Sequence, residues 1–386
     1  MTPASASGDL PPGRPLTPPI VASSTFSFES TADCLRAVRG EGHIYSRWGN
    51  PTVESLEARL ADLCGSEAAI AFSSGMAAVS NALLSALARV GRPRLLCHRE
   101  VYGGTYELVR DLLPRYGVEV RWFSSDGWEE AFEGRWGVVY AETPTNPTLR
   151  VLDLERLAVA ARRVGALLVV DNTFATPLGQ RPLLLGADVE VHSASKYLGG
   201  HHDLLAGVVA CARDFAHTLW THRKLFGATL DPFPAYLLHR GLETLSLRVR
   251  RQSETAWQLA RWLAEQSWVE RVHFPWLPEH PDHQVARRQL ELPGGMLSFE
   301  VHGGLAAAAG LADRLRRIRH AASLGGTATT LTLPAATSHA GLSAEERAAA
   351  GIADGLVRLS VGLEDLDLLT TDLSAAAQGT ETRPRA

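Results

Sequence analysis

The chain has 386 residues, of which 45% are hydrophobic and 21% charged, and its formal net charge is −4. This length can bury a large core and predicts more than one domain. The slight negative charge, with arginines scattered among acids and no basic stripe, argues against a nucleic-acid partner, and no apolar run is long enough to predict a membrane span.

The N-terminal residues 1–20 contain six prolines and no apolar segment of the kind found in secretion signals. They predict an extended arm that is disordered alone or lies across another surface. The four cysteines lie far apart and form no C-x-x-C pair, which argues against a zinc site or a disulfide framework. We therefore expect a reducing, cytoplasmic setting for these residues, which are Cys34, Cys64, Cys97 and Cys211.

Short apolar segments that predict strands alternate with helical patterns in the middle of the chain. The helix from residue 51 has Asn50 as its cap, Pro51 in its first turn and Gly65 at its end. This alternation predicts a mostly parallel sheet covered on both faces by helices. The expected strands are 68–73, 94–98, 118–123, 137–142, 166–171, 188–193 and 206–211.

The pattern changes near residue 230. Residues 230–266 predict one long helix, and the segments 294–301 and 355–373 that follow suggest a smaller α+β domain. We therefore divide the chain into an arm (1–50), a large α/β domain (51–235) and a C-terminal domain (236–386), whose last residues, 379–386, we expect to be frayed.

Polar residues follow several of the expected strands. Ligands of open α/β sheets bind beyond the carboxyl ends of the strands, so these side chains are expected to meet. Each has an ordinary alternative, such as a glycine turn, a loop tyrosine or a helix cap. They are Ser73-Ser74-Gly75-Met76 at a helix start, Tyr102, Asn146, Asp171, and Lys196 with Ser193 and Ser195 before it.

Pyridoxal 5′-phosphate would use all of these groups. Its aldehyde forms a Schiff base with a lysine amine, here Lys196. A carboxylate such as Asp171 keeps its ring nitrogen protonated, because opposite charge favours the charged form. Its phosphate needs N–H and hydroxyl donors of the kind found at a helix start, and its ring needs a stacking partner such as Tyr102.

At this point the sequence resembles a known family, the fold-type I pyridoxal-phosphate enzymes of cysteine and methionine metabolism. The family includes cystathionine γ-synthase, cystathionine and methionine γ-lyases, and O-acylhomoserine sulfhydrylases. The resemblance runs from about Pro18 to Leu373 and implies a mostly parallel sheet domain with a smaller C-terminal α+β domain. It is carried by the segments YSRWGNPTVESLE, SSGMAA, ETPTNPT, VVDNTFATP, SASKYLGGH and RLSVGLED.

The resemblance implies a role for each candidate residue. Lys196 would be the Schiff-base lysine, Asp171 the partner of the ring nitrogen, and Tyr102 both the stacking ring and the acid that protonates the leaving group. Arg358 would bind the substrate carboxylate, as a guanidinium fork suits a carboxylate, and Ser323 would line the same position. The residues expected to hold the cofactor also include Gly75, Met76, Asn146, Ser193 and Ser195.

The family also implies active sites shared between subunits. Tyr45 and Arg47 would reach the neighbouring subunit and bind its phosphate, and Tyr45 would also contact substrate. The arm would then contribute to the neighbouring subunit in a homodimer or homotetramer. His201, His202 and Asp203 invite a metal hypothesis, but adjacent histidines rarely point the same way and no third ligand is evident, so we expect no metal.

The choice of reaction rests on what lies around the distal end of the substrate. Cystathionine-handling relatives often carry acids where this chain has Ile44 and Ala328, which disfavours a substrate with two ammonium groups. Methionine γ-lyases, however, often carry a cysteine where this chain has Gly104. We favour a Cγ–S lyase that converts methionine or homocysteine-like substrates to a 2-oxo acid, ammonia and a thiol.

Other reactions remain open from the sequence. They are those of cystathionine γ-lyase and of the γ-replacement enzymes, cystathionine γ-synthase and O-acylhomoserine sulfhydrylase. An aminotransferase shares the lysine and the aspartate, but the YSRWGNPT segment and the C-terminal motif argue against it. A catalytically inactive interaction protein is disfavoured by the intact Lys196, Asp171, Tyr102 and Arg358.

Overall fold

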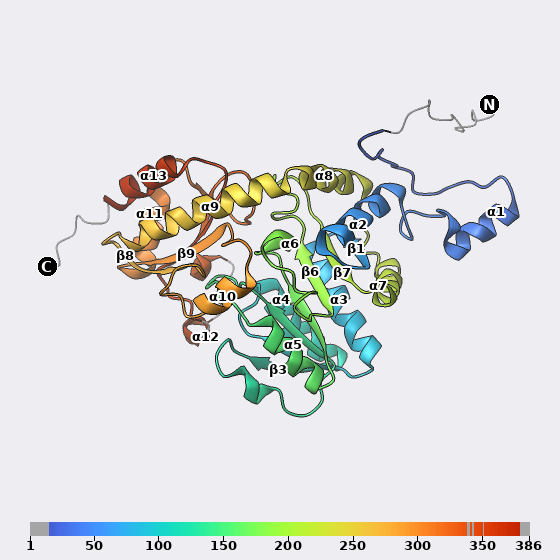
Figure 1. Ribbon diagram of the computed structural model, residues 1–386, viewed down its shortest axis with the longest axis horizontal. Helices are drawn as coiled ribbons and strands as arrows, with labels where there is room; N and C mark the ends of the chain where they lie inside the picture. Colours follow the sequence, from blue (N-terminus) through green and yellow to red (C-terminus); the bar gives the residue numbers. More distant parts are fainter. Residues whose placement is uncertain (1–14, 338–339, 342, 350, 379–386) are drawn as a thin grey trace.

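The computed structural model describes residues 15–337, 340–341, 343–349 and 351–378. Most of the proline-rich start and the expected frayed end, 379–386, lie outside the described residues. Figure 1 shows two bodies side by side, a large sheet with its helices and a smaller C-terminal one, with residues 15–50 extending away at the N-terminal end.

The large body contains a seven-stranded sheet in the order β1-β7-β6-β5-β4-β2-β3. All seven expected strands are present, and all pairs are parallel except those that β7 makes with β1 and β6. The link from β6 to β7 carries no helix across the sheet, so β7 returns antiparallel. The strands are β1 (Ala68–Phe72), β2 (Arg94–His98), β3 (Glu119–Phe123), β4 (Val138–Glu142), β5 (Leu167–Asp171), β6 (Val189–Ser193) and β7 (Gly207–Cys211).

Helices cover both faces of this sheet. Helices α3 (Gly75–Val90) and α7 (Arg213–Phe226) pack on one face, and α2 (Pro51–Cys64) and α5 (Leu154–Arg163) pack on the other. The predicted ends of α2 are confirmed, because the Asn50 side chain accepts from the Thr52 N–H and Gly65 adopts φ 65°. Short helices α4 (Gly103–Glu107) and α6 (Thr176–Gly179) follow two of the strands.

The single helix predicted over residues 230–266 is wrong. The segment forms α8 (Pro232–Glu243) and α9 (Leu245–Ala264), which separate at Thr244 (φ −108°, ψ 5°). Arg248 donates to the Gly241 carbonyl at 2.7 Å and to the Tyr197 carbonyl at 2.8 Å, so one guanidinium ends α8 and holds the segment after β6. The break depends on this tertiary contact, and helical periodicity continues through it.

The C-terminal body is the expected α+β layer. Helices α9, α11 (Gly304–Arg314) and α13 (Leu366–Gln378) pack on a five-stranded sheet in the order β10-β11-β12-β9-β8. Short helices α10 (His283–Gln289) and α12 (Ala344–Ala349) flank it. Its strands are β8 (Val269–His273), β9 (Met296–Val301), β10 (Arg319–His320), β11 (Thr330–Thr332) and β12 (Leu356–Ser360). The boundary placed between residues 235 and 236 falls within α8.

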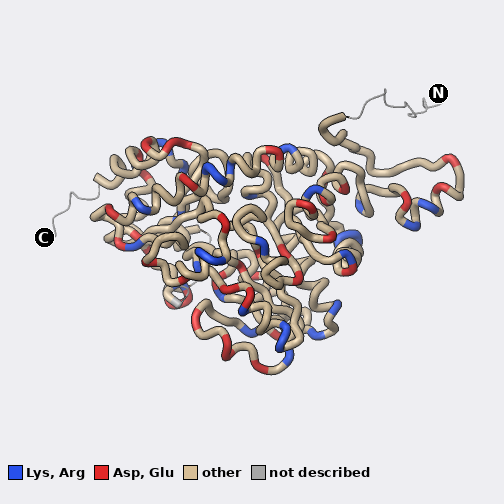
Figure 2. Tube along the Cα trace, in the orientation of Figure 1, with Lys and Arg blue, Asp and Glu red and all other residues tan. Residues whose placement is uncertain are grey.

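The arm carries α1 (Thr31–Arg36), which stands away from the body in Figure 1. An antiparallel bridge between Thr25 and Tyr45 closes the arm on itself, and Val21 donates to the Thr52 hydroxyl at 2.9 Å. Among the described residues no helix is long and apolar enough to cross a membrane. The four cysteines are free, and Figure 2 shows acidic and basic residues interspersed along the trace.

A buried ion pair fixes the strand that leads to the start of α3. The Glu57 carboxylate accepts from the Ala71 N–H at 2.8 Å and pairs with Arg223 of α7, which also donates to the Ala71 carbonyl at 2.9 Å. We expect Arg223→Met to lower the free energy of unfolding by about 3–5 kcal/mol, because it leaves a buried carboxylate unpaired. Urea unfolding at fixed protein concentration measures this loss, and adding Glu57→Gln should recover most of it. Equal stability of the single and double variants would contradict the account.

Candidate active site

One cavity of about 670 Å³ collects most of the predicted site residues at the carboxyl edge of the large sheet. The cavity lies where β4, β5 and β6 end and the C-terminal sheet approaches. Ten of the predicted residues line it, namely Gly75, Met76, Tyr102, Asn146, Asp171, Ser193, Ser195, Lys196, Ser323 and Arg358. Tyr45 and Arg47 do not.

Lys196 lies in the turn that follows β6. Its backbone N–H donates to the Ser193 carbonyl at 3.1 Å, and its Nζ donates to the Ser323 Oγ of the C-terminal body at 2.9 Å. Burial, and then the neighbouring Arg358 charge, lower the pKa of the Lys196 ammonium. A lowered pKa raises the fraction of neutral amine, which is the form that attacks a carbonyl.

Asp171 is the last residue of β5 and is buried. Its Oδ1 accepts from the Thr173 N–H at 3.0 Å and from the Thr173 hydroxyl at 2.6 Å, and the Tyr140 hydroxyl lies 3.3 Å from its Oδ2. Burial raises the pKa of Asp171, and the bonds from Thr173 oppose that rise. A cationic group beside this carboxyl would restore the charged form, since opposite charge favours it.

Glu142 is a second buried acid, which the sequence analysis missed. It ends β4 directly beside Asp171 in the strand register, lines the same cavity, and accepts from the Tyr102 backbone N–H at 2.7 Å. Burial, and then the Asp171 carboxyl, raise the pKa of Glu142 well above its usual range. Like Asp171, Glu142 is a carboxylate at the end of an apolar strand, and this pattern could have identified it. In the sequence analysis, Glu142 was instead treated as the last residue of the strand 137–142.

The start of α3 provides an anion site. Ser74 caps the helix by accepting from the Ala77 N–H at 3.1 Å, so the first amides of the helix stay free for a ligand. A Cβ at Gly75 would lie 2.7 Å from the Ser193 side chain, so this glycine is needed for the close approach. The Ser195 hydroxyl instead bonds the Ala206 backbone, accepting at 3.0 Å and donating at 3.3 Å.

Arg358 lies on β12 at the opposite side of the cavity and is buried. Its Nη1 donates to the Asn146 Oδ1 at 2.8 Å and its Nη2 to the Ser323 carbonyl at 3.4 Å, while its Nε has no partner among the described residues. Burial lowers the pKa of Arg358 to about 10, so it stays cationic at neutral pH. Ser323 adopts φ 78°, a strained conformation in which its carbonyl meets Arg358 and its hydroxyl meets Lys196.

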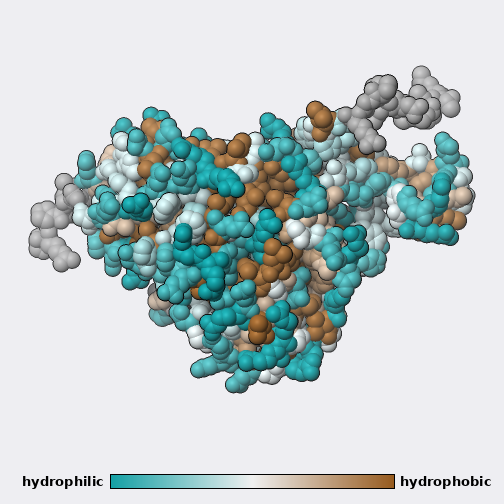
Figure 3. All heavy atoms as spheres, in the orientation of Figure 1, coloured by the Kyte–Doolittle hydropathy of each residue, from teal (hydrophilic) through white to brown (hydrophobic). Residues whose placement is uncertain are grey.

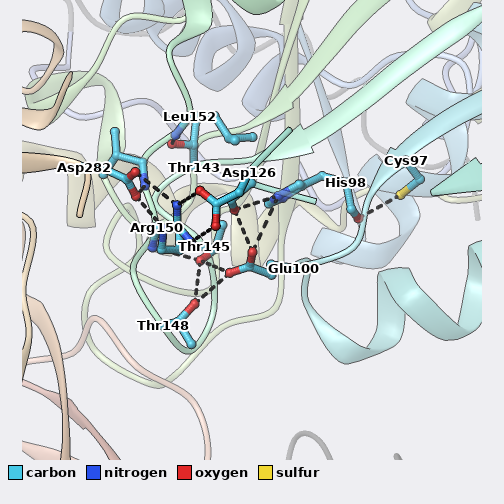
Figure 4. Close-up of polar contacts among 12 residues, drawn as sticks. Cys97, His98, Glu100, Asp126, Thr143, Thr145, Thr148, Arg150, Leu152 and Asp282 are labelled. Carbon is cyan, nitrogen blue, oxygen red and sulfur yellow. Dashed lines mark hydrogen bonds and ion pairs between the residues drawn. The ribbon is translucent and has the colours of Figure 1, made fainter. Parts of the chain in front are cut away.

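A polar network behind the cavity fixes the loop that carries Asn146 (Figure 4). Glu100 accepts from the Ser125 hydroxyl at 2.6 Å and from the Thr148 hydroxyl at 2.8 Å. Arg150 donates to Asp282 of the C-terminal body at 2.7 Å. Glu100 lies two residues before Tyr102, and Thr148 lies two residues after Asn146. The network therefore fixes the backbones of Tyr102 and Asn146 relative to each other.

Tyr45 and Arg47 lie outside the cavity of their own chain. Arg47 donates to the Lys224 carbonyl at 2.7 Å and its guanidinium carbon lies 5.5 Å from the Tyr45 ring centroid. Tyr45 is 42% exposed. The chain therefore leaves both side chains at its surface, and their predicted role would need a second subunit.

The histidine pair and a separate buried cluster do not line the cavity. His201 bonds the Gly199 carbonyl at 2.8 Å, and His202 packs against Gly326, where a Cβ would lie 1.9 Å from its Nε2. Among the described residues, the one group of possible metal ligands is Cys64, Glu190 and His192. It is buried under α2, and its Glu190 Oε1 already bonds His192 at 2.7 Å and the Asn172 amide at 2.8 Å.

Comparison with known proteins identifies the family. The family model described as Cys/Met metabolism PLP-dependent enzyme matches residues 10–378. This chain belongs to that family.

The chain is similar both to γ-replacement enzymes and to a γ-lyase. It is 42% identical over 360 residues to an O-succinylhomoserine sulfhydrylase of Pseudomonas aeruginosa, covering 92% of this chain and 89% of that protein. It is 40% identical over 373 residues to an L-methionine gamma-lyase of Pseudomonas putida, covering 94% and 93%. The crystal structure of a cystathionine gamma synthase from Xanthomonas oryzae pv. oryzae, in complex with aminoacrylate and cysteine, superposes with a TM-score of 0.88 at 39% identity, covering 95% and 93%.

The predicted family, fold class and cofactor are thereby confirmed. The chain is a pyridoxal-phosphate enzyme of cysteine and methionine metabolism that acts on amino acids, and its relatives divide between lyases and γ-replacement enzymes. The cavity fits the cofactor, since it has an amine at Lys196, a buried acid at Asp171 and an anion site at the start of α3. When bound, the cofactor supplies an electron sink for a carbanion at the substrate Cα.

The first test concerns the covalent link to the cofactor. Borohydride treatment should fix the cofactor on the peptide that contains Lys196, and peptide mass spectrometry locates it. Lys196→Ala should carry no fixed cofactor and should retain its fold, because the side chain makes one hydrogen bond and packs in no strand. Cofactor fixed on another lysine in the wild-type protein would remove this assignment.

The second test concerns the buried acid. Asp171→Ala should lower kcat by orders of magnitude, because a ring nitrogen without a carboxylate partner holds its proton poorly. Thr173→Ala should give a smaller loss, since Asp171 then keeps its charge and the bond from the backbone N–H of residue 173, and loses only the bond from the hydroxyl. Steady-state kinetics measure both, and wild-type turnover in Asp171→Ala would show that another group supplies the charge.

Proposed function

We propose that this chain is a Cγ–S lyase that converts methionine or homocysteine-like substrates to a 2-oxo acid, ammonia and a thiol. The observation that supports it best is that apolar side chains line the same cavity as Tyr102, among them Met76, Val79 and Leu205. Such a wall suits a thioether or a short thiol, whose transfer from water is favourable. Ile44 and Ala328 add no charge that would attract a second ammonium group.

Each polar residue then has one task. Arg358, fixed by Asn146, binds the substrate α-carboxylate as a bidentate pair. The Lys196 amine removes the Cα proton as a base, which its lowered pKa favours. Loss of a Cβ proton then provides the electron pair that expels the thiol from Cγ. Tyr102, whose backbone is held by Glu142, protonates the sulfur as it leaves Cγ. Asp171 keeps the ring nitrogen of the cofactor charged.

γ-Replacement is the second candidate function. It is supported by the 42% identity to the O-succinylhomoserine sulfhydrylase of Pseudomonas aeruginosa. The two functions use the same residues up to departure of the γ-substituent, and they differ in whether water or a thiol then reacts. Release of a 2-oxo acid without added thiol supports the lyase, and thiol-dependent loss of the ester substrate without 2-oxo acid supports replacement.

We further propose that the active unit is a homo-oligomer with shared sites, in a reducing, cytoplasmic setting. Several large apolar side chains are exposed near the ends of α7, α8 and α9, including Leu225, Phe226, Phe233 and Leu247. In the face drawn in Figure 3, hydrophobic residues gather across the centre of the molecule and beneath α8. A surface of this kind is typical of a subunit interface, and it would bring Tyr45 and Arg47 to a partner's cavity.

The substrate preference is tested with methionine, homocysteine, cystathionine and O-acetylhomoserine, by assay of 2-oxobutanoate. We expect kcat/KM for methionine or homocysteine to exceed that for cystathionine about tenfold to a hundredfold, because the distal ammonium of cystathionine loses hydration at a cost of about 1–3 kcal/mol and neither Ile44 nor Ala328 provides a carboxylate to pair with it. Ile44→Glu should shift the ratio toward cystathionine, mainly through KM. A wild-type preference for cystathionine of tenfold or more would favour the cystathionine γ-lyase or synthase alternative.

Shared sites are tested by mixing two inactive variants. Arg47→Ala and Lys196→Ala proteins should regain part of the activity when mixed, because one site of a mixed dimer then receives both intact residues. Subunit exchange is verified first with tagged chains. No recovery after proven exchange would mean that each chain completes its own site.

A further inference from the structure

Among the described residues that line the cavity, one charged side chain forms no hydrogen bond or ion pair. Lys196, Arg358, Glu142 and Asp171 all line the cavity and all form hydrogen bonds with named partners. Glu107 also lines the cavity, is exposed, and forms no side-chain hydrogen bond or ion pair with the described residues. A free carboxylate at the mouth of a substrate cavity has no structural task here.

The position of Glu107 follows from the short helix α4. Residues three and four apart share a helix face, so Glu107 lies over Gly104 and Gly103, which also line the cavity. These glycines have no side chains to shield the carboxylate from the cavity. On its other side Glu107 faces Gly341, where a Cβ would lie 3.9 Å from the Glu107 Oε1.

The cations of the cavity wall lie at the other end of the substrate. Among the described residues they are Lys196 and Arg358, which serve the α-amine and the α-carboxylate. Tyr102 immediately precedes α4 and, on the function proposed above, acts at Cγ. A substituent that leaves from Cγ therefore passes along α4, toward Glu107, and no cation among the described residues that line the cavity lies at that end to balance the Glu107 charge.

We propose that Glu107 determines specificity by the charge of the γ-substituent. It repels a substituent that ends in a carboxylate, such as the succinyl ester of homoserine, and accepts neutral or cationic ones. Cystathionine ends in both an ammonium and a carboxylate, so its net response is small. The inference rests on the proposed site and orientation, and it predicts that this chain discriminates against the substrate after which its Pseudomonas aeruginosa relative is named.

A matched series of amino acids isolates this charge. L-Norleucine, L-ornithine and L-2-aminoadipate carry a methyl, an ammonium and a carboxylate, respectively, after the same three methylene groups. Their Kd values for the cofactor-loaded protein are measured by calorimetry, or by competition with norleucine where binding is weak. We expect 2-aminoadipate to bind at least about tenfold more weakly than norleucine in 20 mM salt, and the ratio to fall at 500 mM salt because exposed charges are screened.

Variants assign the effect to one residue. Glu107→Gln should reduce the ratio of the 2-aminoadipate and norleucine Kd values about threefold to tenfold, Glu107→Arg should reduce it further, and norleucine binding should change less than twofold. Glu130→Gln, which removes an exposed carboxylate that does not line the cavity, is the matched control and should leave the ratio unchanged. A ratio that stays within twofold in Glu107→Gln, or equal weakening of all three ligands, would overturn the proposal.

Turnover separates this proposal from the proposed function. In Glu107→Gln, kcat/KM for O-succinylhomoserine should rise about threefold to tenfold while that for O-acetylhomoserine stays within twofold. If methionine yields no 2-oxobutanoate but the ligand series responds as expected, the lyase function fails and the role of Glu107 stands. If methionine is turned over and the series does not respond, only the role of Glu107 fails.

Discussion

The hydrogen bond from the Lys196 amine to Ser323 joins the two sheets at the reactive position. Lys196 comes from the turn after β6, whereas Ser323 and Arg358 belong to the C-terminal body. The strained backbone of Ser323 aims its hydroxyl at the amine and its carbonyl at the guanidinium. The geometry of the Lys196 amine and the Arg358 guanidinium therefore depends on how the two bodies pack.

That packing is itself held by buried and partly buried polar contacts. Arg248 on α9 donates to the backbone after β6, and Arg150 joins the Asn146 loop to Asp282. Buried polar groups are costly unless they are satisfied, so such contacts allow few alternative arrangements. They act together with an apolar cluster in which Leu324 and Met296 of the C-terminal body pack with Ala194 and Tyr197.

The charged groups of the cavity differ from its base to its mouth. Two buried acids, Asp171 and Glu142, end adjacent strands, and burial raises the pKa of both. Two like carboxyls this close cannot both ionise easily. Asp171 would pair with the ring nitrogen of the cofactor, while Glu142 accepts from the Tyr102 backbone N–H. On the proposed function, Lys196 and Arg358 bind the amino acid itself, and Glu107 remains as a free negative charge at the mouth.

The sequence alone determined the strands, the order of the α/β elements and the residues that follow each strand. Period and turn chemistry are local properties, so the ends of α2 and the seven strands could be predicted from the residues. The resemblance of the motifs supplied the cofactor and the roles of Lys196 and Asp171. Local periodicity could not show the break at Thr244, because the Arg248 guanidinium beside the end of α8 is also held by the Tyr197 carbonyl, which lies in another segment.

Only the tertiary structure decided which polar residues share one space. It paired Glu142 with Asp171 through strand register, turned the Ser195 hydroxyl to the Ala206 backbone, and left Tyr45 and Arg47 outside the cavity of their own chain. It also placed Glu107 over two glycines at the mouth of the cavity. In the sequence analysis, only positions 44 and 328 were compared with the distal acids of relatives, and so Glu107 was not identified. The physical reason is that charge acts through distance in space, and distances between segments are fixed by packing and not by sequence order.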